Sequence, residues 1–488
     1  MMTLVATIVV VVYSLCLAFI FCYSLVQLHL TWLYLTRTPT QVPTVIPKDW
    51  PTVTVQLPVY NERYVVSRLI DAVAAFDYPK DKLQIQLLDD STDETTTLIA
   101  EKIKLLQSHG LTLAHVRRGD RTGFKAGALQ HGLASATGEF IAIFDADFVP
   151  SPDFLKKTIV AFTKPQIGVV QTRWGHLNRD YSLLTRLQAF GLDAHFTVEQ
   201  QGRNNGHYFI NFNGTAGVWR KTCIVDAGGW QADTLTEDLD LSYRAQLKGW
   251  EFVYQEQTES PAELPAEING LKSQQYRWTK GAAETARKHL TDVLISPKPL
   301  HAKLHALFHL LNSSVFVCVL LTAILSIPVL FIKESNPQFD WVFNLGAIFI
   351  ISFLALVTFY WVSASRRGVS KAAIRFIPEF LMFLIMSMGM SLHNSVAVLE
   401  GYMGRKTPFI RTPKYNIVKA QDSWQKKLYT LPTIRIVTWL EGLLALYFVW
   451  GIWLDLQLKD YGLLPFHSML AMGFGLVFFY TLAHYKKA

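Results

Sequence analysis

The segment FIAIFDADF, residues Phe140–Phe148, joins a short apolar run to two carboxylates. A run of this length and composition is typical of a buried β-strand. Residues two apart at an extended strand end point to the same side, so Asp145 and Asp147 can face one ligand. Two carboxylates without His or Cys favour a hard divalent cation such as Mg²⁺ or Mn²⁺. Taken alone, the short D-x-D pattern is equally compatible with a solvated turn.

Strands and helices alternate in the sequence before this segment. Strands are expected over residues 52–60, 84–91 and 111–118, and helices over 62–76, 93–110 and 124–136. The alternation predicts an α/β domain with a parallel sheet and a ligand site at the carboxyl ends of its strands. Asp89 and Asp90 end one strand as Asp145 and Asp147 end another. Two acidic strand ends therefore favour a functional site.

The composition indicates a membrane protein. Half of the 488 residues are hydrophobic, and the mean hydropathy is +0.21. The net charge of +8 is modest, and the basic residues lie beside apolar runs, which suits anionic lipid surfaces better than nucleic acid. The four cysteines form no metal-spaced cluster and predict no disulfide framework.

Long apolar runs divide the chain into a polar domain and a membrane region. Residues 1–36 carry no charged side chain and are long enough to remain as a membrane anchor. Further runs occupy Leu304–Ile332, Trp341–Ser365, Ile436–Leu454 and Tyr461–Tyr485. The expected organisation is an N-terminal span (1–36), a polar domain (50–270), interfacial amphipathic helices (271–300), two spans (304–363), an interfacial helix with a loop (374–430) and two final spans (434–485).

The segment TEDLDLSYR, residues 236–244, places acids at a predicted helix start. Thr236 can cap this helix, and Glu237 and Asp238 then lie in the first turn, where the helix dipole favours negative charge. That preference explains the acids without any function. A carboxylate at this position is also suited to remove a proton from an attacking hydroxyl.

The segment QQYRW, residues 274–278, places Gln274, Arg277 and Trp278 on one helical face. Arginine offers a bidentate fork for a diphosphate, and tryptophan offers a flat face for a sugar ring. An interfacial helix with Trp and basic residues at the lipid headgroups is the alternative. The two interpretations are compatible.

Together these motifs carry a family resemblance. LPVYNE, LLDDSTD, KAGAL, FDADF, FNGTAGVWR, TEDLDLSYR and QQYRW follow one another as in processive family 2 glycosyltransferases. Residues 50–415 resemble the plant cellulose-synthase-like A and C group of mannan and glucan synthases, and bacterial cellulose synthase. The resemblance implies a Rossmann-like, GT-A type nucleotide-sugar transferase domain inserted into an α-helical transmembrane region with interfacial helices.

The resemblance also implies roles for individual residues. Asp238, with Glu237 beside it, would be the catalytic base, and Asp145 and Asp147 would bind the metal, Mg²⁺ or Mn²⁺. The implied donor-binding residues are Pro58, Tyr60, Glu62, Asp90, Lys125, Asp145 and Arg277. The implied acceptor-binding residues are Trp278, Gln274, Gly214 and Thr215.

A loop in cellulose synthases with the pattern F-x-V-T-x-K closes over the donor, and FIRTPK, residues 409–414, stands in its place. Phe409, Thr412 and Lys414 match this pattern. Arg411 replaces the valine, and Pro413 stiffens the loop. A gating-loop-like segment is expected here, and these two differences argue against free lid motion.

The distribution of Lys and Arg decides between five and six spans. Arg37 and Lys48 follow the first span, which places the N-terminus outside and the polar domain in the cytosol. If Phe380–Gly401 crossed the membrane, the basic segment 404–427 would lie outside. We therefore expect five spans and an interfacial helix, with Glu379, His393 and Glu400 forming a polar stripe. A sixth span with its polar face toward a channel is the alternative.

The expected function is an inverting, processive β-glycosyltransferase in the plasma (inner) membrane. It would polymerise a glucan, mannan or glucomannan from UDP-glucose or GDP-mannose and pass the chain through its own spans, with accessory export subunits as possible partners. Addition of one sugar to a membrane lipid, as in ceramide glucosyltransferases, is the alternative enzyme. A transporter or receptor with a degenerate transferase domain is disfavoured because every expected acid is present.

Overall fold

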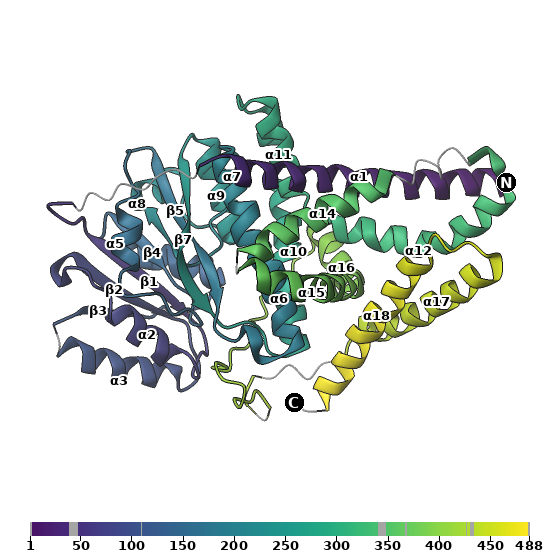
Figure 1. The fold of residues 1–488 in the computed structure, drawn as a ribbon. Coiled ribbons are helices and arrows are strands. Elements are labelled where there is room, and N and C mark those ends of the chain that lie inside the picture. The colour runs from purple at the N-terminus through teal and green to yellow at the C-terminus, as the bar shows by residue number, and fades with distance from the viewer. Residues whose placement is uncertain are drawn as a thin grey trace.

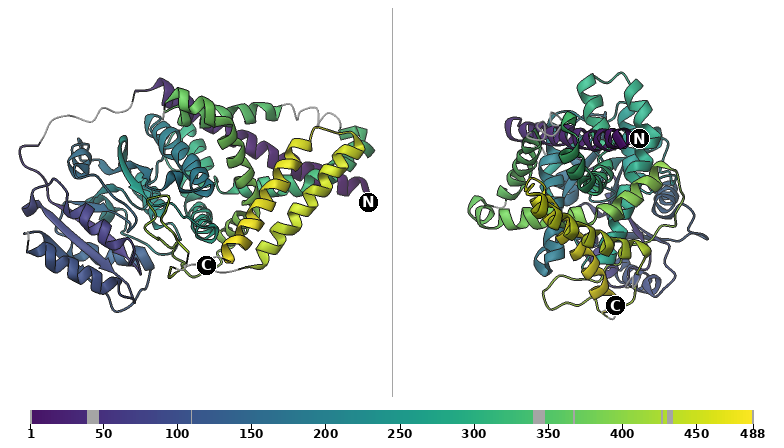
Figure 2. Two further views of the ribbon diagram at one scale, coloured as in Figure 1. Left: turned by 60° about the horizontal axis from the view of Figure 1, so that its bottom comes forward. Right: turned by 90° about the vertical axis from the view of Figure 1, so that its right-hand side faces the viewer.

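The computed structural model describes residues 2–38, 47–108, 110–339, 348–366, 368–425, 427–429 and 434–486. A mixed α/β domain occupies one end of the molecule and a group of long helices the other (Figure 1). The two parts meet along α6, α10 and the helices near them, as two further views also show (Figure 2).

The α/β domain contains a seven-stranded sheet with the order β3-β2-β1-β4-β6-β5-β7. The strands are β1 (Val53–Val59), β2 (Leu83–Asp89), β3 (Thr112–Val116), β4 (Phe140–Ile143), β5 (Ile167–His176), β6 (Gly217–Arg220) and β7 (Glu251–Ala262). Strands β1–β4 are parallel, as predicted. The prediction of an all-parallel sheet is wrong beyond β4, because β6 runs antiparallel to both β4 and β5.

Helices cover both faces of this sheet, so its central strands are buried on both sides. The helices are α2 (Val66–Ala74), α3 (Thr95–Gln107), α4 (Phe124–Ser135), α5 (Phe154–Ile159), α8 (Lys221–Asp226) and α9 (Glu237–Leu247). Val55 and Ala142 pack in the core under α2, α3 and α5. Ile141 and Ile143, one residue removed along β4, pack in the opposite core with α4, α8 and α9. This double burial fixes the carboxyl ends of β1, β2 and β4 in one place.

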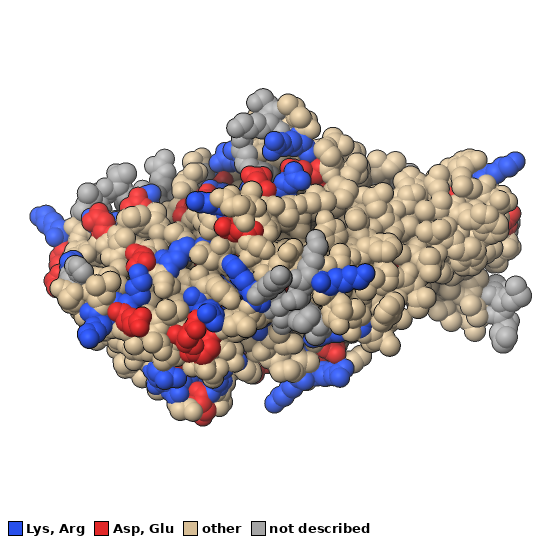
Figure 3. Space-filling model, turned by 90° about the horizontal axis from the view of Figure 1, so that it is seen from below, with Lys and Arg blue, Asp and Glu red and all other residues tan. Residues whose placement is uncertain are grey.

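The helical part contains the candidate membrane spans. Its helices are α1 (Met2–Thr36), α6 (Leu183–Ala194), α7 (Gln200–Asn205), α10 (Ile268–Ile295), α11 (Leu300–Leu310), α12 (Ser314–Ser335), α14 (Ile348–Ser365), α15 (Val369–Gly389), α16 (Ser391–Tyr402), α17 (Ile436–Leu458) and α18 (Leu464–Tyr485). Four of the described helices, α1, α12, α17 and α18, are long and apolar enough to cross a membrane, and α14 is a shorter apolar helix. Figure 3 shows charged side chains over the α/β domain and a largely uncharged surface over this part. The chain is a multi-pass membrane protein.

Two expected boundaries differ from the structure. The apolar run Leu304–Ile332 is not one helix, because a turn at residues 311–313 separates α11 from α12. The next expected span begins at Trp341, and its residues 341–347 lie outside the described part of the chain.

The segment Phe380–Gly401 is also two helices rather than one. The chain breaks at Met390 between α15 and α16, and their axes differ by 51° for residues 373–389 and 391–402. The prediction of a single helix with one polar stripe is therefore wrong. His393 and Glu400 belong to α16 and contact α10, through the Lys272 carbonyl (2.9 Å) and the Tyr276 hydroxyl respectively. The cytosolic interfacial position of this segment stays a prediction.

The start of α10 is fixed to the last two helices by buried polar contacts. Lys272 Nζ lies 2.7 Å from Glu441 Oε2 of α17 and 3.0 Å from Thr481 Oγ1 of α18. All three side chains are buried, and breaking such a buried pair leaves an uncompensated charge. The contacts therefore join the C-terminal helix pair to the helix that carries QQYRW.

Candidate active site

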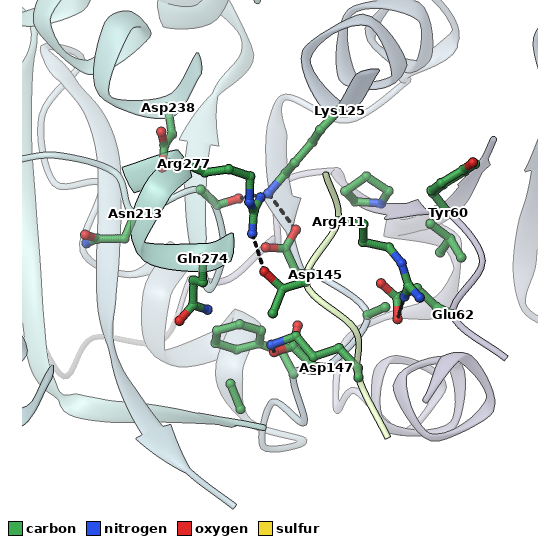
Figure 4. A pocket seen from close by; sticks show the side chains of 18 of the residues that line it. Tyr60, Glu62, Lys125, Asp145, Asp147, Asn213, Asp238, Gln274, Arg277 and Arg411 are labelled. Atoms are coloured by element: carbon green, nitrogen blue, oxygen red, sulfur yellow. Dashed lines mark hydrogen bonds and ion pairs between the residues drawn. The ribbon is translucent and has the colours of Figure 1, made fainter. Parts of the chain in front are cut away.

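A cleft of about 1270 Å³ opens where the carboxyl ends of β1, β2 and β4 meet α9 and α10 (Figure 4). The loop of residues 405–418 crosses its mouth. Sixteen of the seventeen residues predicted for the site line this cleft: Pro58, Tyr60, Glu62, Asp90, Lys125, Asp145, Asp147, Gly214, Glu237, Asp238, Gln274, Arg277, Trp278, Phe409, Thr412 and Lys414. The exception is Thr215.

Thr215 supports the cleft from behind instead of facing it. Its side chain is fully buried, and its hydroxyl accepts a hydrogen bond from the backbone N–H of Asp145 at 2.9 Å. Thr215 lies two residues before β6 and does not line the cleft, so its role in acceptor binding stays a prediction. Thr215 instead fixes the backbone at the first aspartate of D-x-D.

Lysine side chains hold both aspartates of D-x-D. Lys125 Nζ lies 2.5 Å from Asp145 Oδ1 and donates to the Gly214 carbonyl at 2.9 Å. Burial lowers the pKa of Lys125, but the negative charges of Asp145 and Glu237 raise it by more, so the pKa of Lys125 lies above its usual value. Lys414 Nζ of the loop lies 2.6 Å from Asp147 Oδ2. Each carboxylate keeps one oxygen outside its lysine contact.

The donor set suits a hard cation only in part. Carboxylate oxygens are the ligands that Mg²⁺ and Mn²⁺ prefer. Among the described residues, however, no group of three or more His, Cys, Asp or Glu side chains could hold a metal ion. Asp145 and Asp147 can therefore bind such an ion together with substrate oxygens, as Mg²⁺ sites at phosphates commonly do.

Two acids lie at the start of α9, Glu237 buried and Asp238 half-buried. Asp238 accepts from the N–H of Leu239 at 2.8 Å, while Glu237 Oε1 lies 4.0 Å from Lys125 Nζ. Burial, and next the charge of Glu237, raise the pKa of Asp238 to about 7. Burial also raises the pKa of Glu237. Thr236 is the N-cap residue, as predicted, but its side chain makes no capping hydrogen bond.

The loop residues Phe409–Lys414 contact the cleft and its border through four side chains. Phe409 stacks on Phe124 with ring centroids 5.4 Å apart, and Thr412 Oγ1 accepts from Arg277 at 2.8 Å. Arg411 NH1 lies 2.6 Å from Glu62 Oε2, and Lys414 contacts Asp147 as described. Burial raises the pKa of Glu62 to about 7, although Arg411 lowers it. The residue that departs from the cellulose synthase pattern thus forms an ion pair inside the cleft.

Known proteins share this sequence and fold. A sequence profile described as glycosyltransferase like family 2 matches residues 51–281. Glucomannan 4-beta-mannosyltransferase 2 of Arabidopsis thaliana is 34% identical over 425 residues, which cover 83% of this chain and 76% of the relative. Glucomannan 4-beta-mannosyltransferase 1 of rice (Oryza sativa subsp. japonica) is 34% identical over 437 residues, covering 84% of this chain and 79% of the relative.

The chain belongs to glycosyltransferase family 2. A solved structure shares the fold of this family 2 enzyme: a mannosyltransferase from Pyrobaculum calidifontis, determined in complex with GDP-Man and Mn²⁺. The TM-score is 0.58 at 18% sequence identity, and the match covers 82% of this chain and 100% of the archaeal protein. The sequence-based assignments of fold, family and enzyme class are confirmed.

Several side chains in or beside the family 2 cleft are not among the predicted site residues. Arg118, beside the cleft, holds Asp90 through two hydrogen bonds of 2.8 and 2.5 Å. The Arg121 guanidinium lies 3.3 Å above the centre of the Tyr60 ring. The basic run RRGDR, which ends three residues before KAGAL begins, could have indicated these two arginines. Trp174, His176 and Asn213 also line the cleft, and no motif considered above marks the first two.

A second cavity adjoins the family 2 cleft on the membrane side. Leu192, Gln274 and Trp278 line both spaces. The second cavity continues between α6, α10, α14 and α15 to Phe316 of α12 and Asn394 of α16. Its other lining residues are mainly apolar: Leu184, Leu187, Leu271, Tyr360, Phe383, Met386 and Met390.

Proposed function

We propose that this family 2 enzyme transfers mannosyl units from GDP-mannose to the end of a mannan or glucomannan and joins them there by β-linkages. The names of its plant relatives and the GDP-Man bound by the archaeal mannosyltransferase support this donor over UDP-glucose. The convergence of the acids Glu237 and Asp238, two cations and a tryptophan in a single cleft supports the transfer chemistry.

In the proposed reaction, Asp238 accepts the proton of the acceptor hydroxyl as this hydroxyl attacks the anomeric carbon. Direct displacement inverts the anomeric configuration and releases the nucleoside diphosphate. Lys125 and Arg277 lie on the cleft where they can neutralise that leaving group. A divalent cation bound by Asp145 and Asp147 would supply further charge neutralisation at the diphosphate. Trp278 offers its ring face to the acceptor sugar.

Processive elongation and passage through the membrane are part of the proposal. The shared lining of cleft and second cavity supports them, because a product that leaves Trp278 meets that cavity directly. We further propose a cytosolic catalytic domain, an external N-terminus and a plasma (inner) membrane location. Accessory export subunits remain compatible with this arrangement.

A second candidate function is the addition of one mannose to a membrane lipid. The mainly apolar lining of the second cavity favours it, because a lipid tail would pack against Leu187, Leu271 and Phe383. The size and solubility of the product separate the two functions.

The test uses purified full-length protein in lipid nanodiscs with radiolabelled GDP-mannose or UDP-glucose and Mn²⁺ or Mg²⁺. We expect an ethanol-insoluble product from GDP-mannose that endo-β-1,4-mannanase degrades. A product that is extracted into chloroform–methanol would support the single-addition enzyme. Asp238→Asn is the matched control, and we expect it to lower the rate at least ~10²-fold. Absence of product from every donor would contradict both functions.

A further inference from the structure

The helix behind the acceptor end of the cleft contains an irregular turn. Residues His195–Glu199 form a π-helical turn, η3, between α6 and α7. Such turns are frequent at functional sites because they shift the side chains out of α-helical register. Here the turn presents His195 toward the segment FNGTAGVWR.

His195 connects a buried ion pair to a residue of the cleft. Its Nδ1 lies 2.9 Å from Glu199 Oε2, and its Nε2 lies 3.2 Å from Asn213 Oδ1. Glu199 in turn accepts two hydrogen bonds from the buried Arg203, at 3.1 and 3.0 Å. The three side chains thus form a continuous chain of contacts that ends at Asn213.

The protonation of this chain follows from its charges. Burial opposes ionisation of Glu199, but Arg203 and then His195 hold the pKa of Glu199 well below its usual range. Glu199 is therefore a carboxylate that accepts from His195 Nδ1, and the Asn213 amide oxygen is also an acceptor, so the imidazole ring links the two by donating from both of its nitrogens. The imidazole ring is held in one orientation, with Nε2 toward Asn213.

Asn213 is fixed on one side only. Its Oδ1 faces His195 and accepts from Asn211 Nδ2 at 2.8 Å, and its backbone N–H donates to Gln171 at 3.0 Å. Its side-chain Nδ2 makes one long contact of 3.3 Å, to the Asn211 carbonyl. An amide nitrogen carries two N–H groups, so one N–H of Asn213 has no partner among the described residues and remains for a ligand.

Asn213 lines the cleft next to Gly214, whose Cα borders the Asp238 carboxylate. Figure 4 shows Asn213 and Gln274 on the side opposite Tyr60 and Glu62. We propose that Asn213 donates a hydrogen bond to an acceptor-sugar hydroxyl, and that His195 is the positioning residue that orients its amide. This inference rests on the proposed function, since the ligand is the end of a β-linked mannan.

The test measures binding of β-1,4-mannohexaose by calorimetry, without donor, to the full-length protein in detergent. We expect Asn213→Ala and His195→Ala each to raise the Kd about tenfold, as expected for the loss of one hydrogen bond. The double variant should bind no more weakly than Asn213→Ala, because His195 acts through Asn213. His195→Gln, which keeps a donor toward Asn213, should recover part of the affinity. His131→Ala, an exposed histidine on α4, is the control.

Binding of GDP with Mn²⁺ and turnover complete the test. The Kd of GDP should not change in any variant, and KM for mannohexaose should rise with little change in kcat. The inference would be overturned if the losses of mannohexaose affinity multiplied in the double variant, or if the Kd of mannohexaose stayed unchanged in the single variants. It would also be overturned if the affinity for GDP fell as much as the affinity for mannohexaose. A wild-type protein that binds mannohexaose but transfers no mannose would instead contradict the proposed function alone.

Discussion

At the scale of single residues, the charges of Asp238 and Glu237 oppose each other, because the charge of Glu237 raises the pKa of Asp238. Asp238 must be ionised to accept a proton, and its pKa is raised to about 7 by burial and by Glu237. The rate should therefore rise as the pH increases through about 7. Glu237→Gln removes the neighbouring charge and should move this rise to lower pH, which a pH profile of the initial rate at saturating donor measures. An unchanged midpoint would contradict the assignment of Asp238 as the base.

Gly214 leaves no room for a side chain beside that base. Its φ is +78°, and an added Cβ would lie 2.9 Å from Asp238 Oδ2 and 3.4 Å from Lys125 Nζ. We expect Gly214→Ala to lower kcat more than ~10-fold through a displaced Asp238 and a strained backbone. Gly119→Ala, where an added Cβ meets nothing within 4 Å, is the matched control in the same assay. Equal rates for the two variants would show that the packing at Gly214 is unimportant.

At the scale of elements, the loop 405–418 is attached to the cleft mainly by charges. Arg411→Val restores the residue of the cellulose synthase pattern but leaves Glu62 buried without its cation. We expect faster amide hydrogen exchange over residues 409–415 and a higher KM for the donor in this variant. The pKa of Glu62 is already raised to about 7 by burial. Loss of the Arg411 charge raises this pKa further, so Glu62 binds a proton more readily in the variant.

The exposed Arg405 of the same loop provides the control. Its contact is with Glu400 of α16, outside the cleft, so Arg405→Ala should leave the exchange of residues 409–415 unchanged. Equal exchange in Arg411→Val and Arg405→Ala would show that the Glu62 pair does not hold the loop.

The elements also show how far the sequence predicts the structure. Strands β1–β4 form where they were predicted, and β2 and β4 lead into the predicted acids, because apolar runs and the helices that follow them are local patterns. Strand β6 has only four residues, and its antiparallel pairing depends on β4 and β5, which are distant in sequence. The break at Met390 follows Gly389, where an added Cβ would lie 2.2 Å from the Gly473 carbonyl. Close packing against α18, invisible in a local pattern, thus accompanies the division of this apolar segment.

Within the site, motif residues were predictable and their partners were not. Lys125, Asp145, Asp238 and Arg277 belong to short patterns whose chemistry is recognisable. The pairing of Arg411 with Glu62 joins residues almost 350 positions apart, and His195 reaches Asn213 only through a π-helical turn. Such contacts require the tertiary structure.

At the scale of the whole molecule, the ends of the membrane helices indicate one common surface. Lys333 at the end of α12 lies 2.6 Å from Asp460, which follows α17. Under the proposed topology both face the outside, while Asp422 lies in the cytosol. Single cysteines at 460 and 422, in a protein without its four native cysteines, should separate the two sides.

A membrane-impermeant maleimide should label Asp460→Cys in intact cells. It should label Asp422→Cys only after permeabilisation. Labelling of Asp422→Cys in intact cells would support the model with six spans. Labelling of neither cysteine before permeabilisation would contradict the external position of the α17–α18 turn.

The buried contact between Lys272 and Glu441 joins the helix that carries Arg277 to helices long and apolar enough to cross a membrane. No described residue of α17 or α18 lines the cleft, yet both helices bind α10 five residues before Arg277, about 7.5 Å along the axis. A bilayer that is thicker or thinner than the apolar length of these two helices tilts them. We expect Lys272 to transmit such a tilt to α10 and so to shift Arg277, which would make membrane thickness a variable of the transfer rate.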